Sequence, residues 1–203
     1  MASAISAAVA ALPERSFVRR SDFDAPRGPV HTALSRLCTA EALVRVRKGL
    51  YWKGSPTRFG MSRPAVDDIA LEVGGPGSGP AGIAAAHWLG LTTQVPATFV
   101  AAVPTRAPKG WQSVEFSQRS LSRRLREMSP TEVALIEVLR SGPAVVEHPW
   151  ESIASTVGGL VESGTIRPKL ITQQIGDEPH RETRQRWHNL VTAHAELATV
   201  FVA

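Results

Sequence analysis

The chain has 203 residues, of which 43% are hydrophobic and 20% are charged, the balance of an ordinary folded protein with one large domain or two small ones. Without a run of about 18 apolar residues no membrane span is expected, and the single cysteine, Cys38, excludes an intramolecular disulfide, so we expect a cytoplasmic protein. Residues 1–63 carry 11 basic and 4 acidic residues, a net charge of +7, whereas residues 64–203 carry 12 and 14, a net charge of −2, which places any polyanion partner at the N-terminal third.

The first predicted elements are three helices. The alanine-rich N-terminus has apolar residues at helical spacing up to Pro13, and it lacks the basic stretch of a signal peptide. Ser21–Phe23 begins with a capping serine and suits a short second helix. The helical spacing recurs in residues 27–43 and predicts a third helix. Its apolar positions are Val30, Ala33, Leu34 and Leu37.

A basic hairpin is predicted directly after the third helix. Val44 and Val46 alternate with arginines, as in a strand with one wet face, and Lys48–Gly49 can form the turn before a return strand at 50–52. Three helices followed by a basic hairpin form the winged helix-turn-helix pattern, in which the third helix enters the major groove of DNA and the hairpin contacts phosphates or the minor groove. We therefore predict a winged-helix DNA-binding domain over residues 1–53.

The outward-facing residues of this domain are candidate DNA contacts. Arginine on a recognition helix can donate two hydrogen bonds to guanine, short hydroxyls reach base edges or phosphate, and hairpin cations neutralise phosphates. The candidates are Thr32, Ser35 and Arg36 of the third helix and Arg45, Arg47 and Lys48 of the hairpin. His31 is expected to face solvent or a phosphate rather than a metal. The alternative is that all of these are ordinary solvated side chains.

The rest of the chain is predicted to be a linker and a second domain. Residues 54–64 are polar and contain proline and glycine, which predicts the linker. The C-terminal domain, residues 65–203, is expected to be mixed α/β at first and helical afterwards, so that the whole chain is α+β and mainly helical. We predict helices at 65–73 and 81–91, strands at 98–104 and 111–120, and a helix opened by a capping box at Ser129 and Glu132.

Two groups of polar residues in this domain allow alternatives. Four arginines between residues 117 and 127 are expected on a solvated helix face, or else in a patch that meets a partner or extends the DNA footprint. They are Arg119, Arg123, Arg124 and Arg126. His188 and His194 are six residues apart, which is no ligand spacing on a helix, so no metal site is expected.

The stretch "GGPGSGPAG", residues 74–82, raises the question of a nucleotide site. Glycine-rich loops before a helix can bind phosphate, but a Walker-type loop needs lysine and a hydroxyl where Ile83 and Ala84 stand. The segment before the loop also reads as a helix rather than a strand. We expect a tight connection. Gly77, Ser78 and Gly79 are nucleotide-binding candidates, for ATP and Mg²⁺, only if the protein is a kinase.

Three stretches resemble the AbiEi family, the antitoxin half of type IV toxin–antitoxin systems, in the form found in mycobacteria and other actinobacteria. They are "ALSRLCTAEALVRVRKGLYWKG", "GSGPAGIAAAHWLGLTTQVPATFVAAVP" and "SPTEVALIEVLRSG", and the likeness extends over most of the chain. The resemblance implies a protein that represses its own operon by binding operator DNA and that neutralises a nucleotidyltransferase-like toxin. It carries the DNA role to the six candidates above and carries no catalytic residue, so no cofactor is expected.

Two other functions are kept beside the antitoxin. The first is an atypical serine kinase that inactivates the toxin by phosphorylation. The second is a generic winged-helix regulator that senses a small ligand in its C-terminal domain. The sequence does not fix the oligomeric state.

Overall fold

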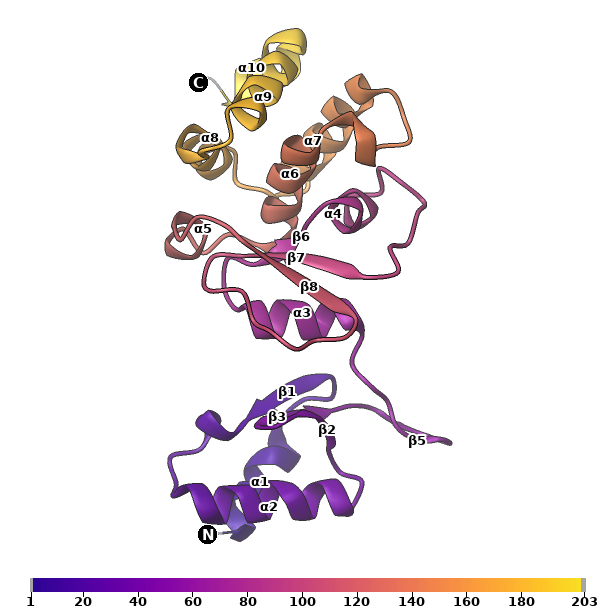
Figure 1. Cartoon of the computed structure of the whole chain (residues 1–203), viewed down its shortest axis with the longest axis vertical. Coiled ribbons are helices and arrows are strands. Elements are labelled where there is room, and N and C mark those ends of the chain that lie inside the picture. Colours follow the sequence, from indigo (N-terminus) through magenta and orange to yellow (C-terminus); the bar gives the residue numbers. More distant parts are fainter. Residues whose placement is uncertain (1, 202–203) are drawn as a thin grey trace. The chain divides into compact units, whose positions relative to one another are not determined.

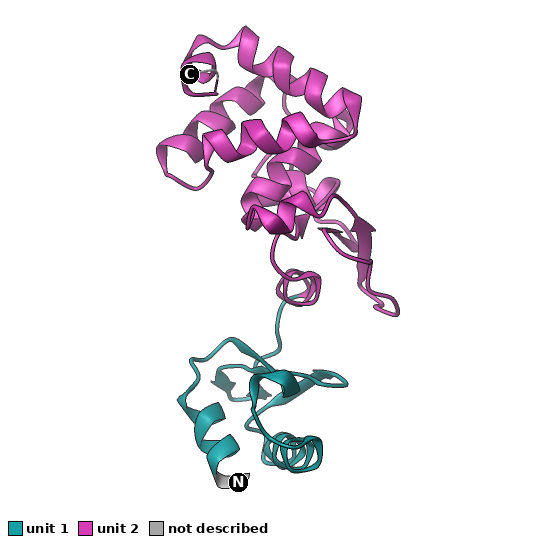
Figure 2. Ribbon diagram, turned by 90° about the vertical axis from the view of Figure 1, so that its left-hand side faces the viewer, with its two compact units in different colours: residues 1–65 teal, residues 66–203 magenta. Residues whose placement is uncertain are grey.

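The computed structural model describes residues 2–201, which separate into two compact units with the boundary in the chain between Ala65 and Val66. Figure 2 colours unit 1 teal and unit 2 magenta. Both units combine helices with a small sheet, and helices predominate, so the predicted α+β, mainly helical class is confirmed (Figure 1). Within residues 2–201, no helix has the length and apolar character needed to cross a lipid bilayer.

Unit 1 packs two helices on a three-stranded antiparallel sheet in which β3 lies between β1 and β2. Its elements in chain order are α1 (Ala2–Ala11), β1 (Ser16–Arg19), a 3-10 turn (Arg20–Asp22), α2 (Arg27–Thr39), β2 (Val44–Arg47), β3 (Leu50–Lys53), β4 (Pro56–Thr57) and β5 (Gly60–Met61). The order from α1 to β3 keeps the predicted sequence of helices followed by a hairpin, with α2 as the last helix, and we call the β2–β3 hairpin the wing.

Unit 1 differs from the prediction in two helices. The predicted second helix is a single 3-10 turn, and Asp22 rather than Ser21 caps it, because its carboxylate accepts a hydrogen bond from the Arg19 N–H at 2.6 Å. The helix α2 ends at Thr39 and not at residue 43, because Glu41 adopts a left-handed φ of +54° and so breaks the helical path.

The core of unit 1 explains which face of α2 remains in solvent. Val30, Ala33 and Leu34 are buried, as their spacing predicts, and they pack against α1 and the sheet. The ammonium group of Lys53 donates to the carbonyls of Val9, at 3.1 Å, and Ala10, at 2.7 Å, and so satisfies the C-terminal end of α1. Because Val30, Ala33 and Leu34 hold one side of α2 in the core, the opposite side of α2 is left exposed to solvent.

The predicted linker contains a second, very short hairpin, β4–β5. Its base is closed by Ser55 and Ser62, whose backbone and side-chain groups form hydrogen bonds of 2.9 and 2.8 Å. At its tip the Phe59 side chain is 86% exposed, and the Arg58 guanidinium lies 4.6 Å from the ring centroid. Residues 54–64 therefore form a defined structure.

Unit 2 places a three-stranded sheet between one helix and a set of packed helices (Figure 1). Its first elements are α3 (Val66–Gly74), β6 (Gly79–Pro80), α4 (Ile83–Trp88), β7 (Phe99–Val103), β8 (Val114–Gln118) and α5 (Ser122–Leu125). Its later helices are α6 (Pro130–Ser141), α7 (Ile153–Glu162), α8 (Pro168–Asp177), α9 (Arg181–Ala193) and α10 (Ala195–Phe201), with 3-10 turns at Pro143–Val145 and Trp150–Ser152.

The middle strand β7 separates two hydrophobic cores. It pairs antiparallel with β6 and parallel with β8. Since strand side chains alternate between the two faces, Ala101 and Val103 contribute to the core under α3, whereas Ala102 contributes to the larger core with α4 and α6. Small residues in β7 let both layers approach the sheet closely.

The helix α6 lies at the centre of unit 2, and residues 132–139 are buried without interruption. The predicted capping box is confirmed. The Ser129 hydroxyl accepts from the Glu132 N–H at 3.2 Å, and the Glu132 carboxylate accepts from the Ser129 N–H at 2.8 Å. The same carboxylate is paired with the Arg167 guanidinium, at 2.6 Å, so this cap also fixes the start of α8.

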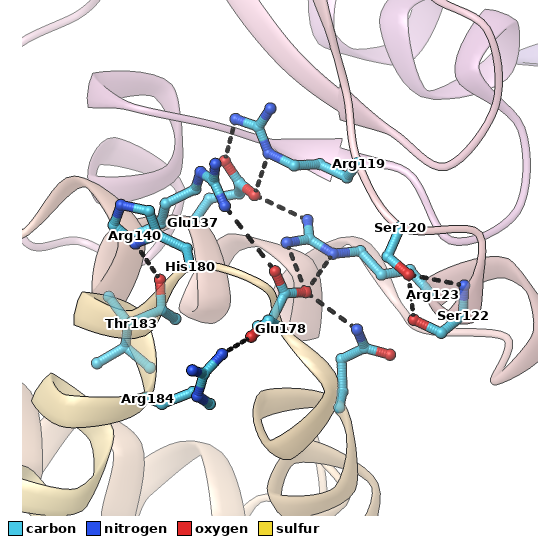
Figure 3. Close-up of polar contacts among 12 residues, drawn as sticks. Arg119, Ser120, Ser122, Arg123, Glu137, Arg140, Glu178, His180, Thr183 and Arg184 are labelled. Atoms are coloured by element: carbon cyan, nitrogen blue, oxygen red, sulfur yellow. Dashed lines mark hydrogen bonds and ion pairs between the residues drawn. The ribbon is translucent and has the colours of Figure 1, made fainter.

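The prediction of a solvated helix face for the arginines of residues 117–127 is wrong for three of the four. Arg123 is fully buried, and its guanidinium lies between the carboxylates of Glu137, at 2.8 Å, and Glu178, at 2.9 Å (Figure 3). Arg119 forms two hydrogen bonds of 2.8 Å to Glu137. Arg126 donates to Gln174 at 2.7 Å and pairs with Asp177.

Glu132 and Glu137 are both ionised in the folded protein at neutral pH. Burial alone raises the pKa of Glu137, but the hydrogen bonds and charges of Arg119 and Arg123 outweigh it, so the pKa lies below its usual range. The pKa of Glu132 is likewise lowered by Arg167 and by two backbone hydrogen bonds, against the opposing effect of burial. The folded state of unit 2 therefore requires carboxylates, not carboxylic acids.

We predict that Glu137→Gln destabilises the protein strongly. The substitution leaves Arg119 without its charge partner and Arg123 with only one, and loss of one partner from a buried ion pair costs about 3–5 kcal/mol. Urea unfolding followed by circular dichroism measures the effect. The matched control is Glu182→Gln, which breaks an exposed i,i+4 pair with Arg186 and should cost about 0.5 kcal/mol or less. Equal losses in the two variants would contradict a dominant role of the buried pairs.

We also predict loss of stability in acid. The folded pKa values of Glu132 and Glu137 lie below the unfolded value of about 4.3, so their contribution is fully present above that pH and is lost as the pH falls through the folded values. Melting temperatures between neutral pH and pH 3 should show this fall. Glu137→Gln should fall less steeply than the wild type, and parallel curves would exclude Glu137 as a source.

Candidate nucleic-acid interface

All six residues predicted to contact DNA are exposed. Thr32, Ser35 and Arg36 lie on the side of α2 that faces away from its buried apolar positions. Arg45 and Arg47 are the outward residues of β2, since Val44 and Val46 turn partly inward, and Lys48 follows in the turn. Gly49 has a φ of +82°, the left-handed conformation that the predicted tight turn requires. The fold thus leaves these side chains accessible on α2 and the wing.

A hollow of about 500 Å³ lies between the start of α2 and the wing. It brings together Thr32, Arg45 and Lys48 of the six candidates, while Ser35, Arg36 and Arg47 are outside its lining. Its lining also includes two cations that sequence reasoning missed, Arg20 and Arg27, together with His31. Arg20 begins the 3-10 turn and Arg27 begins α2, so only the tertiary fold shows that they share a surface with the wing. We call this feature the cationic hollow.

Cys38 is packed rather than reactive. Burial raises the pKa of its thiol, and the nearby charge of Arg45 offsets this only in part. The thiol is therefore protonated at neutral pH and does not act as an anionic partner for Arg45.

The glycine-rich stretch has a geometry that does not favour a phosphate loop. Gly77, Ser78 and Gly79 are all buried. A Cβ atom on Gly77 would lie 2.6 Å from the backbone N of Arg124, and one on Gly79 would lie 2.5 Å from Cβ of Val133. The glycines are needed because the chain passes directly against α5 and α6. The structure therefore presents this stretch as a tight connection, as the sequence predicts.

Unit 2 has an open apolar groove of about 400 Å³ beside α4. Its lining includes Trp88, Val95 and Phe99, and Val95 is largely exposed. The Trp88 indole N–H donates to the Thr131 hydroxyl at 3.2 Å, which fixes the ring at the edge of the groove. Among residues 2–201 no three His, Cys, Asp or Glu side chains form a group that could hold a metal ion.

Comparison with known proteins assigns neither a family nor a function to this chain. No protein-family model matches the sequence, and no curated protein matches it significantly. Among solved structures the chain is similar to the Rv2827c protein from Mycobacterium tuberculosis, with 18% sequence identity and a TM-score of 0.46 over 98% of this chain and 79% of that one. At this identity and score the likeness supports no statement about function.

We predict that Gly79→Ala destabilises unit 2, because the added methyl group collides with Val133 and with the Pro130 carbonyl. Overpacking of this kind costs about 1–3 kcal/mol. Gly158→Ala is the control, since Gly158 lies inside α7 with open space around it and alanine should stabilise a helix by about 0.5–1 kcal/mol. Urea unfolding of both variants measures the difference. A neutral Gly79→Ala would mean that the close approach is not required.

Proposed function

We propose that unit 1 binds double-stranded DNA and that the protein is a cytoplasmic DNA-binding repressor of the antitoxin class. The observation that carries the DNA part is the joint exposure of Arg36 on α2 and of Arg45, Arg47 and Lys48 on the wing of a unit with a net charge of +7. A winged-helix unit with cations on both elements suits a duplex, whose phosphates demand positive charge and whose major groove admits a helix.

The two elements would have different tasks in this complex. On α2, Arg36 is the side chain able to read guanine with two hydrogen bonds, and Ser35 and Thr32 are short enough to approach base edges or phosphates. The wing cations would contact phosphates, which positions the protein without reading sequence. Specificity would therefore depend on α2, and the salt dependence of binding on the wing.

The antitoxin part of the proposal rests on the resemblance of the three sequence stretches to the AbiEi family. In unit 2, the groove beside Trp88 and Val95 offers exposed apolar surface of the kind that protein partners cover. The proposed partner is the nucleotidyltransferase-like toxin encoded beside the gene, and the proposed regulation is repression of the shared operon.

A growth assay tests the antitoxin part. Expression of the neighbouring toxin-like gene alone should arrest growth, and co-expression of this protein should restore it. Incubation of both proteins with ATP and Mg²⁺ followed by intact-mass measurement of the toxin separates the mechanisms. Rescue with an unchanged toxin mass supports neutralisation without phosphorylation, whereas a gain of phosphate would establish the kinase alternative. Without a neighbouring toxin gene, the generic regulator becomes the better reading.

We predict that Arg36→Ala weakens binding to the DNA upstream of the gene by about 1–3 kcal/mol and leaves binding to an unrelated duplex almost unchanged. Arg47→Ala should weaken binding to both duplexes and lower the slope of log affinity against log salt by about one. Gel-shift titrations at several salt concentrations measure both effects. Lys169→Ala, which removes an exposed cation from α8 in unit 2, is the control. A wild-type protein that binds neither duplex at low salt would refute the proposal.

A further inference from the structure

We infer that the cationic hollow is a binding site for one phosphate group, and that Arg20 and Arg27 are its previously unassigned ligands. The inference rests on the proposed function, because it takes a phosphodiester of the DNA backbone as the source of that phosphate. It goes beyond the proposal because it names a specific site, its ligand and two residues, Arg20 and Arg27, that are not among the six candidates.

The first support is the convergence of charge from separate elements. Arg20 comes from the 3-10 turn, Arg27 from the start of α2, and Arg45 and Lys48 from the wing, and all four line the same hollow. None of the lining residues, all of which the structure describes, is acidic. Four cations without a carboxylate among them repel one another, and an anion between them removes that cost.

The second support is a buried donor without an acceptor. The Nε–H group of Arg20 is buried and has no hydrogen-bond partner among the described residues. A buried, unpaired group of this kind costs free energy and is rare in folded proteins. The backbone of Arg20 is held in place, since its N–H donates to the Gly49 carbonyl at 3.4 Å in the turn of the wing. Arg20 also lines the hollow, but its Nε is shielded from solvent, so the guanidinium has to turn toward the hollow before a phosphate oxygen there can accept this hydrogen bond.

The third support is the open start of α2. Pro26 occupies the N-cap position and supplies no side-chain acceptor to the first turn. Gly28, in that turn, lines the hollow, and a Cβ atom there would meet nothing within 4 Å. Pro29 has no N–H and Val30 donates to the Pro26 carbonyl, so the N–H groups of Arg27 and Gly28 and the positive end of the helix dipole are what the first turn adds to the attraction of the four cations.

The size of the hollow favours a phosphate that belongs to a chain. Its volume of about 500 Å³ exceeds the space that one small anion fills, and it is open to solvent on one side. A phosphodiester can enter it with its flanking sugars, while Thr32 and His31 offer further polar contacts. Because phosphate contacts set register, a phosphate held here would fix how far Ser35 and Arg36, later on α2, reach along the major groove.

The first experiment measures the salt dependence of DNA binding with the full chain. Arg20→Gln and Arg27→Gln are compared with Arg58→Gln, which removes an exposed cation of unit 1 outside the hollow. We expect each hollow variant to lower the slope of log affinity against log salt by about one, with about tenfold weaker binding at 0.1 M salt, and the control to match the wild type. Arg27 is exposed, so its variant retains the fold even if Arg20→Gln does not.

The second experiment follows the Arg20 Nε–H resonance by NMR, assigned through Arg20→Gln, during titration with inorganic phosphate and, separately, with the upstream duplex. A shift with the duplex, together with the lower slopes, supports a backbone phosphate in the hollow. A shift with millimolar phosphate alone, with slopes equal to those of the control, supports the phosphate site but makes a free anion its ligand.

Failure of this inference is distinct from failure of the proposed function. If the wild type binds the duplex and Arg36→Ala weakens it, but the hollow variants match Arg58→Gln and the resonance shifts with neither titrant, the inference is overturned and the proposed function stands. If no duplex binds at all, the proposed function fails, and the titration with inorganic phosphate alone decides whether the hollow takes a phosphate.

Discussion

Unit 2 depends on one buried cation. The Arg123 guanidinium has no solvent to neutralise it, so the carboxylates of Glu137 on α6 and Glu178 after α8 must both remain beside it (Figure 3). This requirement ties three separate chain segments together. It also constrains the glycine-rich connection, because Gly77 passes so close to the Arg123 carbonyl and the Arg124 N–H that no side chain fits there. The glycine at position 77 is thus a consequence of packing against the buried arginine's own backbone.

The two units use charge in opposite ways. In unit 2, Arg119, Arg123 and Arg126 are directed at carboxylates and amides of the same unit, and these bonds hold its helices together. In unit 1, Arg20, Arg27, Arg45 and Lys48 are gathered around an open hollow. Unit 1 carries a net charge of +7, and the cations around the hollow are available for a polyanion. The proposed division of labour follows from this contrast.

The parts predicted correctly from sequence are those governed by short-range patterns. The burial of Val30, Ala33 and Leu34 follows from helical spacing, and the Ser129–Glu132 cap and the Gly49 turn follow from residues at most three positions apart. The burial and pairing of Arg123 could not be predicted from such patterns, because its partners lie 14 and 55 residues away in the chain. The β4–β5 hairpin was missed since two-residue strands show no alternation, and the hollow was missed since three elements form it.

The distance between Arg123 and Glu178 has a consequence during synthesis. Chains grow from the N-terminus at about 5–20 residues per second, so the 55 residues that separate this pair take about 3–11 seconds to be made. The residues of the unit 1 core are all made long before Glu178, since that core ends at Tyr51. On the ribosome, therefore, a folded unit 1 is attached for several seconds to an incomplete unit 2 in which Arg123 is present and its partner Glu178 is not yet made. A ribosome that stalls within this interval would hold a folded unit 1 joined to an incomplete unit 2.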